Sequence, residues 1–264
     1  MLILYLVLSF GAVLAFARTP LQCPLYFLGT FLGLLLLHAL VLAAASLFVN
    51  KKDPNPKRFA FYRKLLVTSI GPLLQLGAVQ VKLVGEEKLP EGGFLLVGNH
   101  RSDFDPITAM YALRGRGVTF VTKKENLDIP VGGRLIAGAG CISLDRADDR
   151  QGLVVIRQVV RRIQAGEAMG IYPEGTRSKT GELLPFRVGC FNAAQWAKCP
   201  LVVLRTRGTE NIGKNFFLRR TPVTLTVAAV FPYEQIRDLD TTEIGELVRS
   251  ILTDGKEGES KWSA

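Results

Sequence analysis

Histidine is scarce in this sequence of 264 residues, which holds only His38 and His100, and its four cysteines form no CxxC pair. Zinc sites need several cysteine or histidine ligands at short, regular spacing, so we expect no metal centre. Cysteines without such spacing are typical of ordinary thiols in a reducing compartment. The sequence also lacks a G-x-S-x-G stretch, which argues against a serine hydrolase of the α/β type.

Two nucleotide-binding motifs begin but are not completed. The stretch GTENIGK at residues 208–214 has the spacing of a P-loop, but Asn215 stands where serine or threonine is required. Residues 138–140 begin a dinucleotide fingerprint, but Ser143 replaces its third glycine. Because no basic module interleaved with aromatic residues is present either, we expect no nucleic-acid partner.

Charged residues are missing from two apolar stretches near the N-terminus, residues 1–17 and 25–49. The second is long enough to cross a membrane, because about 20 helical residues span a hydrocarbon core, whereas the first is marginal. We therefore predict a membrane hairpin over residues 1–50, which either spans the bilayer or inserts into one leaflet. A signal peptide is the alternative for residues 1–17, but the basic segment that would begin it is missing.

Basic residues outnumber acidic residues by 33 to 23, and they concentrate just after the second apolar stretch. By the positive-inside rule, the chain after residue 50 faces the cytoplasm. Such a basic excess also attracts anionic lipid headgroups. We thus expect an integral membrane protein with the domain after residue 50 on the cytoplasmic side. The cluster comprises Lys51, Lys52, Lys57, Arg58, Arg63 and Lys64.

Residues 51–78 are predicted to be a basic linker followed by two short helices, because Gly71-Pro72 interrupts the apolar pattern. These helices would either lie in the membrane interface or cover the core of the following domain. From residue 79 to 253, short apolar runs alternate with helical patterns, and residues 254–264 form a polar tail. Alternating strands and helices predict an α/β fold with a mostly parallel sheet flanked by helices.

The expected strands of the domain over residues 79–253 cover residues 79–84, 94–97, 118–122, 141–144, 169–172, 201–205 and 223–231. The expected helices cover residues 106–113, 131–139, 148–164, 188–197 and 241–252.

The stretch GNHRSDFDP, residues 98–106, places a histidine and an aspartate directly after a predicted strand. Positions five apart on a straight helix point about 140° away from each other, so His100 and Asp105 can meet only across a turn. Pro106 favours such a turn, with Asp105 as the N-cap of the next helix. The same carboxylate could orient the imidazole as a base. A capped turn and a proton-handling pair both remain open, and the place beyond a strand end favours the second.

A second polar stretch after a strand is YPEGTRS, which contains Arg177. Arg177 could bind a phosphate in a fork geometry, with Thr176 and loop amides as further donors. Alternatively, Gly175 merely supplies the positive φ of a turn. Lysines at 123–124 and the Asp145-Arg146 pair follow two other strands, and surface ion pairs would also explain them.

Taken in order, these stretches resemble the motifs of the glycerolipid acyltransferase superfamily, and most closely its 1-acyl-sn-glycerol-3-phosphate acyltransferase branch, over about residues 60–235. Asn126 departs from the pattern, because leucine is usual there, and a looser proline-led strand occurs at residues 199–203. The family's NH-x-S-x-x-D motif (its HX4D signature) is matched by Asn99, His100, Ser102 and Asp105, its lysine-rich region by residues 123–133, its G-x-I-x-x-D/R motif by 140–146 and its [FY]PEGTRS motif by 172–178.

The resemblance implies that His100 is a general base oriented by Asp105, and that the acceptor hydroxyl attacks an acyl thioester without an acyl-enzyme intermediate. Glu174 would organise its loop, and amides around Gly175 would stabilise the oxyanion. The acceptor would be lysophosphatidate and the product phosphatidate, as in phospholipid biosynthesis. The donor would be acyl-CoA or acyl carrier protein, and no cofactor is implied. The side chains implied to hold the acceptor phosphate are Arg177, Lys123 and Arg146.

Three alternatives remain open at this point. The acceptor could be glycerol 3-phosphate or another lysolipid. The chain could be a membrane lipid-binding protein without catalysis, although such a protein would be expected to lack the His100/Asp105 pair. Finally, residues 1–78 could serve as a membrane scaffold for partner proteins.

Overall fold

The computed structural model describes residues 1–50, 56–145 and 149–254. Arg146, one of the predicted phosphate ligands, lies outside the described residues. The chain forms two compact units, one made of Met1–Leu76 with Glu125–Gly140 and the other of Gly77–Lys124 with Cys141–Ala264.

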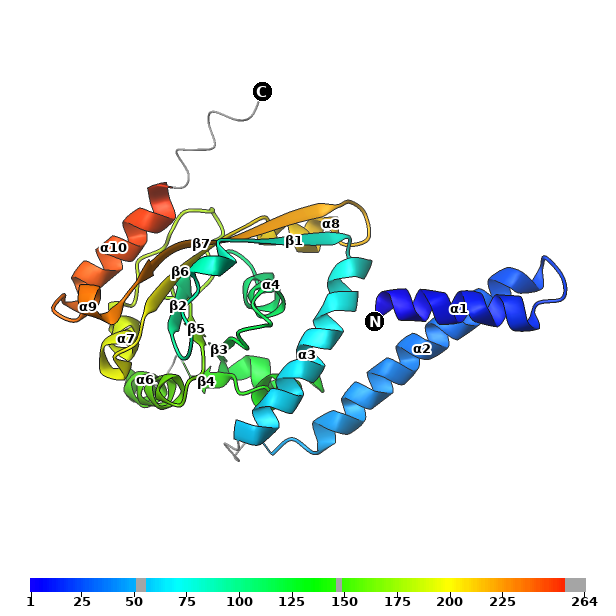
Figure 1. Ribbon diagram of the computed structural model, residues 1–264, viewed down its shortest axis with the longest axis horizontal. Helices are drawn as coiled ribbons and strands as arrows, with labels where there is room; N and C mark the ends of the chain where they lie inside the picture. The colour runs from blue at the N-terminus through cyan, green and yellow to red at the C-terminus, as the bar shows by residue number, and fades with distance from the viewer. Residues whose placement is uncertain (51–55, 146–148, 255–264) are drawn as a thin grey trace, which may run out of the picture. The chain divides into compact units, whose positions relative to one another are not determined.

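The first unit is helical, and it contains the two apolar stretches of the N-terminus as a pair of helices lying side by side (Figure 1). Among the described residues, α2 alone is long and apolar enough to cross a membrane. The 15 residues of α1 rise only about 22 Å, less than a hydrocarbon core of about 30 Å. The helices of this unit are α1 (Leu2–Phe16), α2 (Gln22–Leu47), α3 (Pro56–Leu76) and α5 (Gly132–Gly138).

A chain of polar side chains connects α1, α2 and α3. The hydroxyl of Tyr5 lies 2.8 Å from Nδ1 of His38, and Nε2 of His38 lies 3.0 Å from the hydroxyl of Ser69. Between apolar helices, such hydrogen bonds favour one register over others, because a slipped register would leave polar groups unpaired. His38 therefore has a structural role.

The prediction of two short helices over residues 59–78 is wrong, because α3 continues through Pro72. A proline removes one backbone donor, but tertiary packing can hold the helix on both sides of it. Tyr62, before the proline, and Leu74, after it, are both buried. Helix α5 packs against α3 so closely that a Cβ at Gly138 would lie 2.8 Å from the Tyr62 ring. For this reason residues 125–140 group with the first unit, whereas the sequence predicted one catalytic domain over 79–253.

The second unit is built on a seven-stranded sheet with the order β1-β7-β6-β2-β5-β3-β4. All neighbouring strands are parallel except β6 and β7. The α/β fold with a mostly parallel sheet is thus confirmed, and each of the seven predicted strands is present. The strands are β1 (Val79–Val84), β2 (Leu95–Gly98), β3 (Thr119–Lys123), β4 (Ile142–Leu144), β5 (Met169–Ile171), β6 (Leu201–Arg207) and β7 (Thr221–Phe231).

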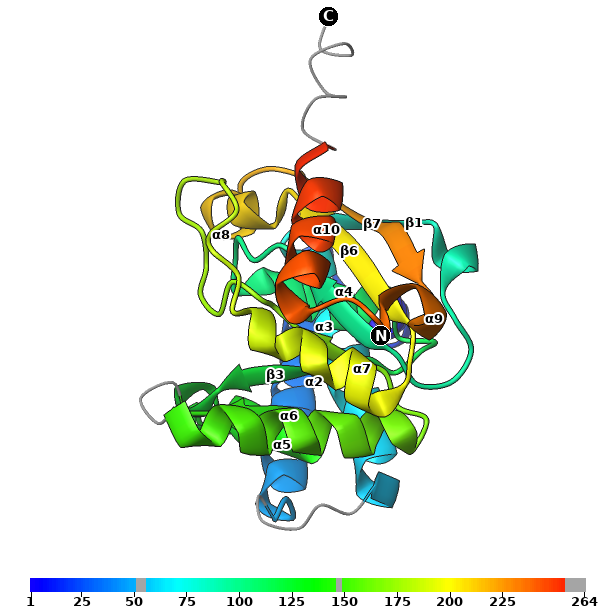
Figure 2. The same ribbon diagram turned by 90° about the vertical axis from the view of Figure 1, so that its left-hand side faces the viewer.

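Helices cover both faces of this sheet. Helices α6, α7 and α10 lie on one face, and α4 lies on the other (Figures 1 and 2). The helix predicted over residues 188–197 consists of a 3-10 turn, Val188–Phe191, followed by α7. The helices are α4 (Phe104–Ala112), α6 (Asp149–Gln164), α7 (Asn192–Ala197), α8 (Ile212–Asn215), α9 (Tyr233–Ile236) and α10 (Thr241–Asp254), with further 3-10 turns at Glu86–Lys88, Lys124–Asp128 and Thr209–Asn211.

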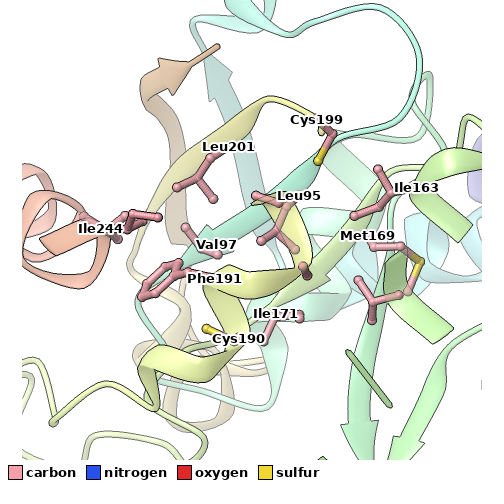
Figure 3. Packing of buried hydrophobic residues seen from close by; sticks show 14 of the residues in the cluster. Leu95, Val97, Ile163, Met169, Ile171, Cys190, Phe191, Cys199, Leu201 and Ile244 are labelled. Atoms are coloured by element: carbon pink, nitrogen blue, oxygen red, sulfur yellow. The ribbon is translucent and has the colours of Figure 1, made fainter. Parts of the chain in front are cut away.

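The main core lies between the sheet and helices α6, α7 and α10 (Figure 3). Alternate residues of the central strands point into it, because side chains in a strand alternate between the two faces. Leu95 and Val97 of β2 belong to this core together with Phe191 and Ile244. The intervening residue Leu96 is also buried, so both faces of β2 are covered. This explains why the central strands are apolar without alternation.

Strand direction gathers the polar loops at one edge of the sheet. Strands β2 to β6 run parallel to one another, so their carboxyl ends share an edge. Strands β7 and β1 run in the opposite direction and begin at that edge. We call this side, formed by the loops after Gly98, Lys123, Ile171 and Arg207 and the loop before Thr221, the carboxyl edge.

Candidate active site

His100 and Asp105 meet at the carboxyl edge, across the turn before α4. Nδ1 of His100 lies 2.8 Å from Oδ2 of Asp105. Asp105 is not the N-cap of the helix, however, because α4 begins at Phe104 and the N-cap position is Asp103. The carboxylate of Asp105 instead reaches back from the first turn of α4 to the loop before it. It therefore orients the histidine and fixes the loop at the same time.

The Asp105 carboxylate is fully buried and accepts four hydrogen bonds. Besides His100, the donors are the backbone N–H groups of Arg101 at 2.6 Å and Ser102 at 2.7 Å, and the hydroxyl of Thr209. A buried carboxylate is stable as an anion when its oxygens are paired in this way. Because an ionised carboxylate only accepts, Nδ1 of His100 carries the hydrogen, and Nε2 carries the lone pair.

The imidazole of His100 is supported from one side by aromatic rings. Tyr172 stacks on it with the ring centroids 4.4 Å apart, and Phe120 stacks on Tyr172 at 5.4 Å. Burial, together with the charge of Asp105, holds the pKa of Tyr172 well above its usual value, so its phenol stays neutral. The His100 side chain is 13% exposed. Within the described part of the chain its Nε2 has no hydrogen-bond partner, which leaves this atom available to a substrate.

The loop after β5 fixes the backbone of His100. Glu174, buried at this edge, accepts hydrogen bonds from the N–H of His100 at 2.7 Å and from the N–H of Leu184 at 2.9 Å. The N–H of Ser178 donates to the carbonyl of His100 at 2.8 Å. Burial raises the pKa of the Glu174 carboxyl, although its two backbone hydrogen bonds lower it in part. Glu174 thus connects two loops whose strands are neighbours.

Gly175 occupies a turn that only glycine fits well. Its φ is +66°, and an added Cβ would lie 2.9 Å from the Arg187 side chain. The N–H of Gly175 donates to the carbonyl of Tyr172 at 3.0 Å. This amide is therefore occupied, so an oxyanion donor in this loop would have to be a different amide. Thr176, the neighbouring predicted donor, is exposed.

Asn99 and Ser102 act on the backbone. The Asn99 amide donates to the carbonyl of Thr206 and accepts from the N–H of Thr206, both at 2.8 Å. This pairing extends the contact of β2 and β6 by one residue, directly before His100. The Ser102 hydroxyl accepts from the N–H of Phe104 at 3.2 Å and so begins helix α4.

The predicted phosphate ligands are held more loosely. Arg177 forms an ion pair with Asp103, and their side chains are 44% and 73% exposed. Lys123 ends β3 at the same carboxyl edge. The next residue, Lys124, pairs with Asp145 at 3.0 Å. The structure thus places Lys123 and Arg177 at one edge of the sheet, and among the described residues neither side chain forms a hydrogen bond with His100.

Three contributors to the site were not predicted from the sequence. Thr209 pairs with Asp105 across 104 residues, and it lies in a stretch whose only local feature is an incomplete P-loop pattern. The stacking role of Tyr172 has a weak signal, since an aromatic residue starts the YPEGTRS motif. Asp103, the partner of Arg177, has none.

The chain is similar to known acyltransferases. A family model described as acyltransferase matches residues 80–206. A 1-acyl-sn-glycerol-3-phosphate acyltransferase of Saccharomyces cerevisiae is 33% identical over 53% of this chain and 46% of that protein. The Escherichia coli protein of the same name is 28% identical over 81% of this chain and 86% of that protein. The chain spans between about half and two thirds of the length of several other curated relatives that it matches.

A solved structure shares the fold. The crystal structure of the 1-acyl-sn-glycerophosphate acyltransferase from Thermotoga maritima matches with a TM-score of 0.58 at 20% identity, over 75% of this chain and 82% of that chain.

Proposed function

We propose that this chain, which is similar to the 1-acyl-sn-glycerol-3-phosphate acyltransferases, transfers a fatty acyl group from an acyl thioester to the free hydroxyl of lysophosphatidate, giving phosphatidate. The observation that carries the proposal is the His100/Asp105 pair, whose Nδ1–Oδ2 bond of 2.8 Å leaves Nε2 as the basic atom. The names of the yeast and bacterial relatives supply the substrate class.

In the proposed reaction, Nε2 of His100 removes the proton of the acceptor hydroxyl. The oxygen attacks the carbonyl carbon of the thioester, a C–O bond forms, and the C–S bond breaks. The imidazolium then returns its proton to the departing thiolate sulfur, so no acyl-enzyme is formed and no cofactor is consumed. Asp105 stabilises the transient imidazolium, and a positioned base of this kind contributes about 10²–10⁴-fold to the rate.

The acceptor phosphate would be held by Lys123 and Arg177, with Arg146 as a further candidate. Strands β2 and β3 are separated only by β5, so their ends lie about 10 Å apart at a spacing of about 4.8 Å. A long lysine side chain can cover much of that distance. The exposed Arg177–Asp103 pair is worth at most about 1 kcal/mol, so a phosphate can take the place of Asp103.

The reaction would take place at a membrane. Many apolar side chains of α1 and α2 are exposed, among them Leu14 at 73% and Leu36 at 62%. Exposed apolar surface of this extent is typical of contact with lipid or protein. The basic residues of 51–64 favour a cytoplasmic catalytic unit, where either acyl-CoA or acyl carrier protein could serve as donor.

The test is acyl transfer by the detergent-purified chain, using lysophosphatidate with a long-chain acyl-CoA or an acyl carrier protein. His100→Ala should lower the rate by at least about a hundredfold. His38→Gln, which removes the other histidine, is the matched control and should retain activity. Comparison with glycerol 3-phosphate and with monoacylglycerol establishes the acceptor. Equal rates for the native chain and His100→Ala would refute the assignment of the base, and no product with any phosphate-bearing acceptor would refute the proposed function.

A further inference from the structure

The segment Phe216–Arg220, between α8 and β7, presents apolar side chains to solvent. Phe217 is 72% exposed and Leu218 is 79% exposed. Among the described residues of the second unit, these two are the most exposed large hydrophobic side chains. Isolated exposed apolar residues are common in soluble proteins, but two adjacent ones at a loop tip indicate a surface that contacts something outside the chain.

This tip has a defined conformation. The N–H groups of Leu218 and Arg219 both donate to the carbonyl of Asn215, at 2.7 and 2.9 Å. The ring of Phe216 packs against Gly77, where an added Cβ would lie 2.4 Å from it, and also against the ring of Phe217. Since these two N–H groups are paired within the turn, the tip can enter an apolar medium at a lower cost than an open loop.

Phe217 adopts a conformation that aromatic residues rarely adopt. Its φ is +63°, in the left-handed region, which carries an energetic cost for a residue with a bulky side chain. Its side chain is mostly exposed, so packing within the protein offsets little of that cost. A residue kept under strain in this way suggests a contact that forms when the protein meets its partner.

The charge around the tip identifies the kind of partner. Lys214, Arg219 and Arg220 flank the apolar pair, and no acidic residue occurs from residue 211 to 233. Arg219 and Arg220 are exposed, and within the part of the chain that is described they form no ion pair. Apolar side chains ringed by cations match a bilayer with anionic headgroups, to which each basic residue near the surface is attracted.

The tip also lies on the same side of the sheet as the candidate active site. It directly precedes Thr221, where β7 begins, and β7 begins at the carboxyl edge. His100 follows β2 at that same edge. Contact of the tip with a membrane would therefore turn the edge that holds His100 toward the lipid.

We propose that Phe216–Arg220 is a membrane-contact tip, which inserts Phe217 and Leu218 into the interface of an anionic bilayer while Arg219 and Arg220 bind lipid phosphates. The proposal deepens the proposed function, because it gives the catalytic unit its own contact with the surface that contains the acceptor. It also stands apart from catalysis, since insertion can be measured without turnover.

The test places a tryptophan at the tip of the full chain in vesicles of phosphatidylglycerol and phosphatidylcholine. Phe217→Trp is compared with Leu153→Trp, since Leu153 of α6 is 47% exposed in the same unit. The native Trp196 and Trp262 give the same background in both. Lipids brominated in their acyl chains should quench the added emission of Phe217→Trp and leave that of Leu153→Trp unchanged. Equal quenching at the two positions overturns the proposal, as does a signal that depends on protein density, which would indicate a second copy of the chain.

Two further variants test the parts of the tip separately. Arg219→Gln/Arg220→Gln in the Phe217→Trp background should lose most of the quenching in anionic vesicles, and retained quenching would refute the role of the arginines. Phe217→Ser/Leu218→Ser should raise the apparent KM several-fold for lysophosphatidate in vesicles and leave it unchanged for the same acceptor in detergent. An equal loss in both would mean that the tip supports the fold instead. If the native chain shows no turnover at all, the proposed function fails, and the quenching experiment still decides on the tip.

Discussion

Asp105, in the first turn of α4, and Arg177, in the loop after β5, follow neighbouring strands, yet the protein holds their charges in opposite ways. Asp105 is fully buried and accepts four hydrogen bonds. Arg177 is 44% exposed and pairs with one carboxylate, that of Asp103, which is itself 73% exposed. A buried charge must stay paired, whereas an exposed pair is weak and can exchange partners. The comparison teaches that the groups proposed to handle the proton are fixed before substrate arrives, while the arginine proposed to bind the phosphate remains free to respond to it.

The largest effect on catalysis is expected from Asp105→Asn, which tests the buried, fixed pair of Asp105 and His100. The asparagine amide would place an N–H₂ group where the carboxylate accepts hydrogen bonds, so at least one donor would lose its partner and Nδ1–H of His100 would lose its anion. We expect the turnover number with lysophosphatidate to fall by at least about a hundredfold with little change in KM. A mutant that keeps its turnover number and loses only affinity would mean that Asp105 serves substrate binding.

A smaller effect is expected from Arg177→Gln, which removes the exposed arginine. This effect should appear in the KM for the acceptor. Loss of a charge-assisted hydrogen bond worth about 1.5–3 kcal/mol should raise the KM for lysophosphatidate by about 10- to 100-fold. Asp103→Asn is the matched control, because it frees Arg177 and should leave that KM unchanged or lower it. Steady-state kinetics with varied acceptor measure both variants. If an acceptor without phosphate loses as much affinity in Arg177→Gln, the arginine does not bind the phosphate.

The next smaller effect on the turnover number is expected from Thr209→Val, which removes a single hydrogen-bond donor from Asp105 and keeps the shape of the side chain. A buried carboxylate oxygen left without a partner costs about 1–3 kcal/mol. We expect the turnover number to fall about tenfold if that cost appears in the transition state, since 1.4 kcal/mol is a factor of ten. Thr209→Ser restores the hydroxyl and should restore the rate. A purely structural role would instead lower the midpoint of thermal unfolding and leave the turnover number of the folded enzyme unchanged.

Thr209 also marks where prediction from the sequence stops. The seven strands were predictable because each is a short, mostly apolar stretch separated from the next by a polar loop or a helical pattern, and the approach of His100 to Asp105 followed from the turn before Pro106. The hydroxyl that completes the Asp105 site comes from a loop 104 residues away. No local sequence pattern predicts this hydrogen bond between Thr209 and Asp105, because it depends on β6 lying beside β2.

The errors have the same origin. Asp105 was predicted to be an N-cap from its place before Pro106, but the three donors of residues 100–102 draw its carboxylate back toward the preceding loop. Pro72 was predicted to break a helix, but packing of side chains on both sides of it keeps α3 continuous. In both cases tertiary contacts outweigh a local preference.

The smallest effect is expected from Glu174→Gln and concerns stability. Glu174 is buried like Asp105, so this variant tests a second fixed carboxyl of the site. Burial raises the pKa of its carboxyl, so the folded protein holds this proton to a higher pH than the unfolded chain does. Its contribution to stability is thus complete below the unfolded pKa of about 4.5 and declines as the pH rises through the folded value.

Glu174→Gln cannot titrate, and one of the two N–H donors would face its amide nitrogen, so the variant should be less stable at acidic pH. The difference in unfolding midpoint between the native chain and Glu174→Gln should therefore shrink as the pH rises above 4.5. Thermal unfolding followed by tryptophan fluorescence in detergent measures it, and a difference that grows with pH would mean that the hydrogen bonds from His100 and Leu184 outweigh the burial of the charge.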